Sequence, residues 1–299
     1  MNVAVTKTAP VEIVRRRVGI DFDPVPPGPW YPPANQALET VLNAMSLTFP
    51  AGERYFIDSV RAYSDRISDP ELRKQVRDFI YQEAMHNRVH IDCNAMLARH
   101  NPRAALIEKG ARVTFRVLRY LPRPFRLSIS SAVEHFSSMA ADTLFHHEKG
   151  FRENVPPEVA QMWLWHAAEE TEHKAVCIDV LRHVSGPFGY LNRIAGMLLA
   201  TPLFLVGVLF ASIVLRRPRS AAAAPRRADV VARELREGPF GGGNMAGVMH
   251  AVIPWKLYFA YYRPSFHPWD YDNSAYVAAW KQRNAGFGRQ AQGEPAGLP

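Results

Sequence analysis

The sequence predicts an all-α protein. Between Ala34 and about Ser185, apolar residues recur at the three- and four-residue spacing of amphipathic helices, and no convincing strand run or hairpin turn interrupts them. Prolines and glycines stand where such helices would begin and end. With 299 residues, 47% of them hydrophobic and 21% charged, the chain can bury a sizeable core in one large domain or two small ones.

Three parts of the chain differ in composition. Residues 1–33 end in the stretch FDPVPPGPWYPP, in which the prolines exclude helix and favour an extended arm. Residues 34–185 carry the helical pattern, and residues 186–299 combine an apolar helix, a basic linker and an aromatic C-terminal segment. We therefore expect a helical bundle with an arm before it, followed by an apolar helix and an aromatic tail.

The first half of the bundle is predicted as two helical stretches. NQALETVLNAMSLTF is amphipathic, and we expect Pro50 and Gly52 to kink or interrupt it before ERYFIDSVRAYSDRI resumes the pattern. The second helix begins at SDPELRKQV, whose first two residues can cap it and whose proline suits the first turn. It should run to about Arg99, before an Asn-Pro pair.

In the second half of the bundle, prolines and glycines mark the predicted ends of the helices. A shorter helix over 103–120 is broken by LPRPF, and the next helix, RLSISSAVEHFSSMAADTLFHHEKG, is closed by Gly150. One further helix is expected to run without a break from Pro156-Pro157 to Gly186-Pro187.

The segment Ile194–Leu215 carries no charge and is long enough to span a membrane, although a wholly buried core helix has the same composition. Arginine is denser after this segment than before it, so the positive-inside rule for a single span would place the bundle outside the cytoplasm. The N-terminus shows no secretory signal, and Cys93 and Cys177 are too few for a disulfide framework and suit a reducing compartment. We therefore expect a cytoplasmic bundle, peripheral to the inner face of the cytoplasmic membrane, whose apolar helix lies in the membrane plane, re-enters it, or packs on a partner such as a second copy.

A formal net charge of +8 raises the question of a nucleic-acid partner. The arginines are scattered rather than gathered in a patch with interleaved aromatic residues, so we expect no nucleic-acid binding. An anionic membrane surface or an acidic substrate accounts for the charge equally well. The apolar segment itself favours a small apolar or lipid-like substrate.

Two Glu-x-x-His motifs fall on separate predicted helices. YQEAMHNRVH contains Glu83 and His86, and ETEH contains Glu170 and His173. Residues three or four apart lie on one face of a helix, so each motif presents a carboxylate beside an imidazole. A solvated face would more often pair glutamate with lysine, and a core face would carry leucine. Carboxylate and imidazole together are ligands of divalent metal ions.

A lone glutamate on an otherwise apolar helical stretch precedes each motif, Glu53 in FPAGERYFIDSV and Glu134 in SISSAVEHFSSMA. The order Glu, Glu-x-x-His, Glu, Glu-x-x-His reads as a duplicated helix pair. Four carboxylates and two neutral imidazoles balance the charge of two divalent ions, and inward-facing positions on four helices would hold them rigidly. The pattern predicts two transition-metal ions, with iron favoured and manganese or zinc also open.

Over about residues 34–185 this pattern resembles the ferritin-like di-iron carboxylate proteins, which implies a four-helix bundle around the metals. The ligands that this resemblance implies are Glu53, Glu83, His86, Glu134, Glu170 and His173. The segments FPAGERYF, QEAMHNRVH and RPSFHPWD are also similar to a bacterial family usually labelled predicted metal-dependent hydrolases. The first resemblance implies oxidation of an apolar substrate with dioxygen. The second implies hydrolysis by metal-generated hydroxide, and a non-catalytic metal-binding protein is the third alternative.

Three more histidines lie near the motifs. His90 is one turn beyond His86, and since an added histidine is found in some oxygenases of the ferritin-like fold, we expect His90 to be a third imidazole ligand. His166, one turn before Glu170, and His135 are expected to support the ligands rather than bind metal.

Overall fold

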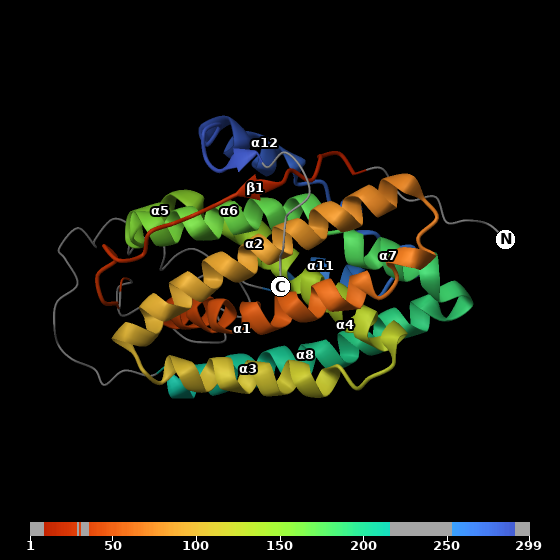
Figure 1. The fold of residues 1–299 in the computed structure, drawn as a ribbon, viewed down its shortest axis with the longest axis horizontal. Helices are drawn as coiled ribbons and strands as arrows, with labels where there is room; N and C mark the ends of the chain where they lie inside the picture. The colour runs from red at the N-terminus through yellow and green to blue at the C-terminus, as the bar shows by residue number, and fades with distance from the viewer. Residues whose placement is uncertain (1–8, 29, 31–35, 216–252, 291–299) are drawn as a thin grey trace.

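Helices make up almost all the regular structure. The computed structural model describes residues 9–28, 30, 36–215 and 253–290 (Figure 1). Its α-helices and 3₁₀ helices, in chain order, are α1 (Gln36–Arg61), η2 (Ser64–Arg66), α2 (Pro70–His100), α3 (Ala104–Leu118), α4 (Arg123–His146), α5 (Glu148–Asn154), α6 (Pro157–His173), α7 (Val176–Ser185), η3 (Gly186–Phe188), α8 (Gly189–Val214), α11 (Trp255–Ala260), η4 (Pro268–Asp270) and α12 (Ser274–Arg283). Within the described residues, strands are limited to β1 (Arg16–Arg17) and β2 (Arg289–Gln290), which pair antiparallel. The all-α prediction is confirmed.

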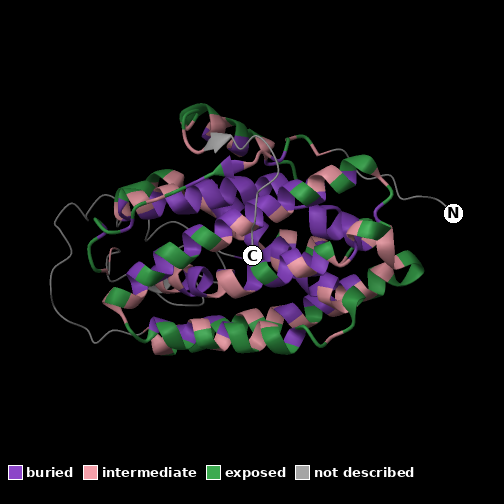
Figure 2. Cartoon of the chain, viewed as in Figure 1, coloured by how far each residue is buried: buried purple, intermediate pink, exposed green. Residues whose placement is uncertain are grey.

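Four long helices enclose the most buried part of the chain. α1 packs against α2 and α4, and α6 packs against the same two helices. Buried residues concentrate where these helices face one another, whereas α3 and α8 run along one edge of the molecule and carry many exposed residues (Figure 2). The interior of this four-helix arrangement is where both Glu-x-x-His motifs point.

The first helix runs without interruption through Pro50, where the sequence predicted a kink or a break. A proline removes one backbone donor and so deprives the carbonyl four residues earlier, here that of Ser46, of its usual partner. The side-chain amide of Asn94 on α2 donates to that carbonyl at 3.0 Å, and Asn87 donates to the carbonyl of Pro50 itself. The Asn94 amide thus replaces the missing helical bond, and Asn87 adds a second hydrogen bond between α2 and this turn, so α1 stays intact.

The start of α2 follows the sequence prediction. Asp69 precedes the first turn in an extended conformation, and its carboxylate accepts hydrogen bonds from the backbone N–H groups of Glu71 and Leu72. Pro70 occupies the first helical position, where a missing N–H costs nothing. The helix ends at His100, one residue beyond the predicted end.

The glycine predicted to end the fourth helix does not do so. α4 begins at Arg123, inside the LPRPF stretch, and ends at His146. Gly150 lies within the separate short helix α5, because the chain already leaves the helical conformation at His147. The prolines at the start of α4 fall at its N-terminus, where they are tolerated.

The helix predicted over 155–186 is divided in two, directly after His173. α6 ends there and α7 begins at Val176. The ammonium group of Lys174, at the break, donates to the carbonyl of Tyr271 and to Asn273 Oδ1, both at 2.8 Å, and lies 3.8 Å from the centre of the Trp269 ring. The C-terminal segment thus holds the break, which a local sequence pattern does not reveal.

The apolar segment forms α8, which is only partly covered by the described chain. One face packs on α4 so closely that a side-chain carbon at Gly196 would approach the backbone of Ser128 to 2.6 Å. The opposite face exposes Val206, Leu209 and Ile213, each about three-fifths exposed. By length and composition one helix, within Pro157–Val214, could cross a membrane; its most apolar window has a mean hydropathy of 2.4 and is 22% buried. Such a helix is weak support for a span.

The aromatic C-terminal segment packs on the bundle. Tyr261 shares a 3.0 Å hydrogen bond with Ser131 on α4, and His267 pairs with Asp179 on α7 at 3.1 Å. α12 lies against α6. The predicted basic linker falls within 216–252 and the last residues within 291–299, both outside the described residues.

Candidate metal centre

The helices bring the predicted ligand residues of both motifs into one buried cluster. α1 contributes Glu53, α2 the first Glu-x-x-His motif, α4 Glu134, and α6 the second motif. Together with His166 of α6, these side chains form three groups that could each hold a metal ion. We call the whole set the carboxylate–histidine cluster: Glu53, Glu83, His86, Glu134, His166, Glu170 and His173. Each of these residues is at most 3% exposed.

Two of the glutamates lie between the two motif histidines. Glu83 Oε1 is 3.6 Å from His86 Nδ1 and 3.3 Å from His173 Nε2. Glu170 Oε1 is 3.6 Å from each of the same two nitrogens. Glu134 Oε2 lies 3.4 Å from His173 Nε2, on the side of the second motif. Each motif glutamate therefore lies within reach of both motif histidines.

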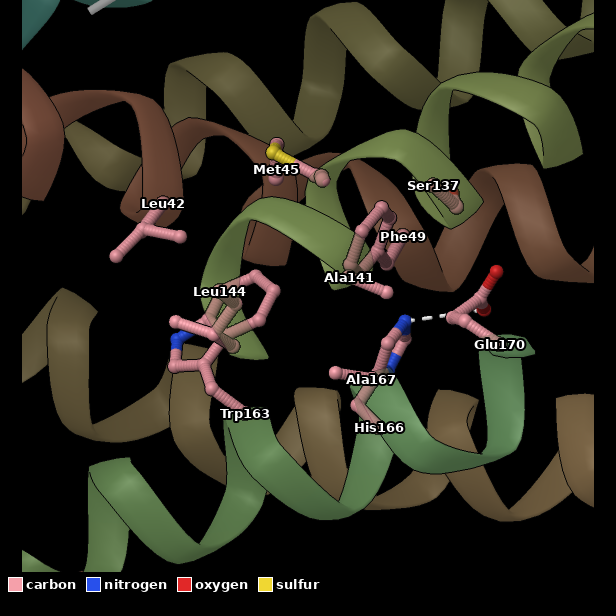
Figure 3. Close-up of a pocket in the computed structure, with 11 residues that line it drawn as sticks. Leu42, Met45, Phe49, Ser137, Ala141, Leu144, Trp163, His166, Ala167 and Glu170 are labelled. Atoms are coloured by element: carbon pink, nitrogen blue, oxygen red, sulfur yellow. Dashed lines mark ion pairs between the residues drawn. The ribbon is translucent and has the colours of Figure 1, made fainter. Parts of the chain in front are cut away.

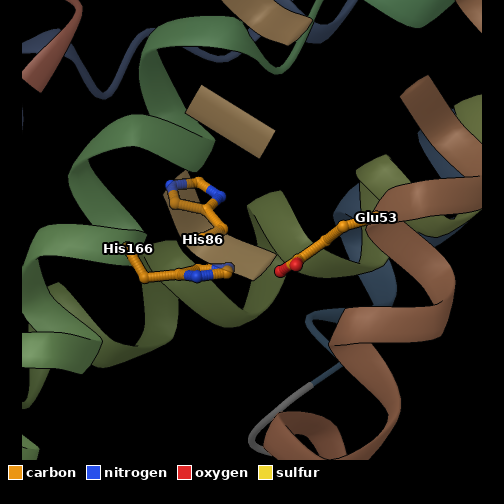
Figure 4. A group of neighbouring side chains, drawn as sticks. All are labelled: Glu53, His86 and His166. Atoms are coloured by element: carbon orange, nitrogen blue, oxygen red, sulfur yellow. The ribbon is translucent and has the colours of Figure 1, made fainter. Parts of the chain in front are cut away.

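The third group joins Glu53 to two stacked imidazoles. The ring centres of His86 and His166 are 4.1 Å apart and the rings are inclined by 27°. Glu53 extends from α1 toward both rings, and one ligand atom from each of the three residues lies within 4.8 Å of the others (Figure 4). His166 Nε2 is also 3.1 Å from Glu170 Oε1.

The donor atoms that face into the cluster lack hydrogen-bond partners among the described residues. Leaving a buried polar atom unpaired costs about 1–3 kcal/mol, and more for a charged group. The unpaired atoms are both carboxylate oxygens of Glu53, Glu83 and Glu134, Oε2 of Glu170, Nδ1 of His86, and Nε2 of His166 and His173. A cation would satisfy all of them together, so the residues present fit a metal centre.

The carboxyl groups repel one another in this buried space. Burial first, and then the charges of Glu170 and Glu134, raise the pKa of Glu53 and Glu83 well above the usual range. Burial and the charge of Glu170 raise the pKa of Glu134 to about 7. Burial acts in the same direction on Glu170, but the neighbouring His173 and His166 outweigh it and hold the pKa of Glu170 below its usual value. Positive charge is what this arrangement lacks.

The histidines divide into neutral and charged members. Burial lowers the pKa of His86 to about 3 and that of His166 to about 4, so both offer a neutral nitrogen. Burial also lowers the pKa of His173, but the charge of Glu170 and the contact with Glu134 raise it overall to about 10. In the protein alone, the proton on His173 provides positive charge that a metal ion would supply.

His90, the predicted third imidazole ligand, is not among the three groups. Asn94 Nδ2 donates to a backbone carbonyl, so its Oδ1 accepts from the hydroxyl of Ser46 at 2.7 Å. That hydroxyl oxygen then accepts from His90 Nδ1–H at 2.8 Å, which leaves His90 Nε2 to accept from His166 Nδ1–H at 3.0 Å. The free Nε2 of His166 consequently faces the cluster, and both nitrogens of His90 are engaged in holding it there.

His135 lies outside the cluster as well. Its Nε2 is 3.1 Å from the carbonyl of Leu257, and its ring packs against Tyr261 and Phe266 of the C-terminal segment. Cys93 and Cys177 are buried and free, and burial raises the pKa of the Cys93 thiol to about 12. These side chains are part of the packed interior.

A narrow cavity of about 30 Å³ reaches the cluster between α1, α4 and α6 (Figure 3). At its inner end lie His166 and Glu170, whose Nε2 and Oε1 atoms are 3.1 Å apart. Apart from these two and Ser137, its wall is apolar, formed by Leu42, Met45, Phe49, Ala140, Ala141, Leu144, Trp163 and Ala167. The cavity suits an apolar group rather than a charged one.

Several residues that support the cluster carry no recognisable sequence signal. Gln82 precedes the first motif and hydrogen-bonds to His173. Glu172 lies within the second motif but points away from the cluster toward Arg16. Arg16 itself lies in the arm, where the sequence suggested only an extended chain. Each of these contacts joins segments far apart in sequence.

Comparison with known proteins identifies the family. A search of curated proteins and a search of solved structures gave no match. The family model described as "predicted metal-dependent hydrolase" matches residues 14–272, which include every member of the carboxylate–histidine cluster and Arg16. This match covers most of the chain, and the chain therefore belongs to the family of predicted metal-dependent hydrolases.

Proposed function

We propose that the carboxylate–histidine cluster binds two divalent transition-metal ions and that the protein is a metal-dependent hydrolase. The observation that carries the proposal is the set of buried carboxylate and imidazole atoms that face one another without hydrogen-bond partners. Family membership favours hydrolysis as the reaction. Because the cluster is fully enclosed by α1, α2, α4 and α6, the arrangement also supports a ferritin-like bundle.

The ligands divide between the two ions by their grouping. Glu53, His86 and His166 would hold one ion, and Glu134 and His173 the other. Glu83 and Glu170, each within 3.6 Å of both motif histidines, would lie between the ions. This assignment gives His166 the ligand role that the sequence favoured for His90.

The bound ions would polarise a scissile bond and make water nucleophilic at neutral pH. The protein itself would position the substrate and exclude bulk water. The cluster is shielded from bulk water, and the apolar cavity ending at His166 and Glu170 would direct an apolar part of the substrate toward it. The volume of about 30 Å³ has room for a small group only, so an ester or amide with a small apolar group is the class of substrate that this wall favours.

A second candidate is oxidation with dioxygen at a di-iron site. The observation in its favour is the donor set, since four carboxylates in one cluster suit iron in high oxidation states, whereas hydrolytic zinc usually has fewer carboxylate ligands. The apolar cavity suits an apolar substrate in this case as well.

One set of measurements separates these functions. The full chain is stripped of metal with a chelator and reloaded with zinc, manganese or ferrous iron. Hydrolysis of p-nitrophenyl esters of increasing chain length and consumption of dioxygen are then followed in each form. Ester hydrolysis by the zinc or manganese form supports the hydrolase. Dioxygen consumption by the ferrous form without hydrolysis supports the second candidate, and metal binding without either reaction supports a non-catalytic metal-binding protein.

The matched variants are His173→Ala and His183→Ala. His183 lies ten positions further along on α7, where it contacts Ser68 near the surface, away from the cluster. Loss of metal and activity in His173→Ala, with both retained in His183→Ala, is the expected result. A wild-type chain that binds none of the three metals would refute the proposal.

We also propose that the exposed face of α8 meets an anionic membrane surface. α8 and α3 lie side by side, and α3 exposes both apolar side chains, such as Val113 and Val117, and the basic side chains of Arg112 and Arg116. Apolar groups would enter the lipid boundary while the arginines contact head groups. Such a position would bring the protein close to lipid-like substrates.

A further inference from the structure

One arginine from the N-terminal arm connects to both motif histidines. Arg16 is 5% exposed, and its guanidinium group forks between two glutamates of α6. Nη1 donates to Glu169 Oε1 at 2.8 Å, and Nη2 donates to Glu172 Oε1 at 2.7 Å. Neither glutamate belongs to the carboxylate–histidine cluster.

The first connection leads to His86. Because Glu169 Oε1 is occupied by Arg16, the other oxygen, Oε2, faces His86 Nε2 at 3.1 Å. As a carboxylate paired with the Arg16 guanidinium, Glu169 accepts at Oε2, so His86 carries its proton on Nε2. The unprotonated Nδ1 of His86 then points at Glu83 and Glu170 inside the cluster.

The second connection leads to His173 through Gln82. The amide nitrogen of Gln82 donates to Glu172 Oε2 at 2.7 Å and to the carbonyl of Val14 at 3.0 Å. These two acceptors fix the orientation of the amide, so Gln82 Oε1 accepts from His173 Nδ1–H at 2.8 Å. Nε2 of His173 is thereby the nitrogen presented to the cluster.

We propose that Arg16 is a positioning residue that fixes the ring orientation and the metal-binding nitrogen of both His86 and His173. The inference rests on the proposed metal centre. It assigns Nδ1 as the ligand atom of His86 and Nε2 as that of His173, so the two motif histidines bind through different nitrogens. A planar guanidinium is needed because it serves two carboxylates at once, which an ammonium group does less well.

The surroundings of Arg16 hold it in this role. Its guanidinium carbon lies 5.3 Å from the centre of the Trp280 ring of α12, and Nη1 also donates to the Val14 carbonyl. Glu172 has a second cation, Lys281, at 2.9 Å. Within the described chain, Glu169 forms an ion pair with Arg16 and a hydrogen bond with His86. Loss of Arg16 should therefore disturb His86 more than His173.

The test compares Arg16→Met with Arg15→Met in the full chain. Arg15 is the adjacent arm residue, is also paired with a carboxylate, Asp78, at 2.7 Å, and lies over the Tyr81 ring, but contacts nothing in the cluster. Zinc affinity is measured by competition with a chromophoric chelator. Removing a group that orients a metal-binding histidine typically weakens binding about 10–100-fold, and we expect that loss in Arg16→Met and less than about twofold change in Arg15→Met.

A second readout reports the nitrogen itself. Nitrogen-15 spectra of the zinc-loaded wild type should show His86 bound through Nδ1 and His173 through Nε2, with the His86 signals moving most in Arg16→Met. Arg16→Lys keeps the charge and should fold if Arg16→Met does not; we expect about tenfold weaker zinc binding than in the wild type.

The outcomes separate the role of Arg16 from the existence of the metal centre. Equal zinc affinity in Arg16→Lys and the wild type, or both histidines bound through the same ring nitrogen, would overturn the role of Arg16 and leave the metal centre standing. A wild-type chain that binds no zinc would overturn the proposed function and this inference with it.

Discussion

Replacing Glu134 by glutamine should stabilise the metal-free protein at alkaline pH while weakening metal binding. The carboxyl group is 2% exposed, and its pKa is raised from 4.5 to about 7 by burial and by the charge of Glu170. Glutamine has nearly the same shape but no charge. The substitution therefore removes the repulsion from Glu170, which the neighbouring His173 relieves only in part.

The size and sign of the effect follow from the pKa. A carboxyl group whose pKa is higher in the folded than in the unfolded protein costs no stability below pH 4.5, progressively more as the pH rises toward 7, and the full amount above that. The gap between 4.5 and about 7, at about 1.4 kcal/mol per pH unit, corresponds to about 3 kcal/mol. Glu134→Gln should gain about that amount at pH 8 and roughly a third to a half of it at pH 5.5.

The assay is urea unfolding, with thermal unfolding beside it, of chelator-treated protein at the two pH values, each followed by circular dichroism. For a chain of this size, about 3 kcal/mol corresponds to a rise in Tm of roughly 5 °C. The control is Glu172→Gln. Burial raises the pKa of Glu172, but the hydrogen bond and charge of Arg16 outweigh burial and lower this pKa overall. Because the ionised form is favoured, Glu172→Gln should be less stable than the wild type. If Glu134→Gln were no more stable than the wild type at pH 8, or gained equally at both pH values, the electrostatic account of the cluster would be wrong.

Three further outcomes are expected. Zinc should saturate near two ions per chain, with fewer in Glu83→Ala or His173→Ala at unchanged helical content; saturation of the wild type at one ion would exclude a dinuclear centre. Zinc binding should release protons and become tighter between about pH 6 and pH 8, because the pKa of His173 is about 10 and that of Glu134 about 7. Calorimetry in buffers of different ionisation enthalpy measures the proton release, and a zinc affinity that does not change with pH would contradict this expectation. Leu205→Asp combined with Phe210→Asp should release the protein from anionic vesicles with its metal still bound. Each of these side chains is 44% exposed, and burying that share in lipid contributes about 1 kcal/mol. Wild-type protein that never sediments with vesicles would refute the membrane proposal.

The sequence was most informative where a short-range rule governs the structure. The spacing of Glu83 and His86, and of Glu170 and His173, places each pair on one helical face whatever the rest of the chain does. Asp69 caps α2 through its own neighbours. The helical class followed from such rules, whereas the gathering of both motifs in one interior was inferred from the order Glu, Glu-x-x-His, Glu, Glu-x-x-His along the chain.

Contacts between distant segments account for the rest. His90 and His166 each lie one turn from a motif, and only the hydrogen bonds of Ser46 and Asn94 show which ring faces the cluster. The break after His173 depends on residues almost a hundred positions later. A pattern confined to one helix contains neither fact.

The position of Arg16 between α6 and the C-terminal segment has a consequence for biosynthesis. Translation proceeds from the N-terminus, so every member of the carboxylate–histidine cluster has been synthesised before α12 and β2 exist. The antiparallel pairing of residues 16–17 with residues 289–290, and the covering of Arg16 by Trp280, can form only after these later residues have been made. During synthesis, Arg16 can therefore reach Glu169 and Glu172 before the residues that cover it are present.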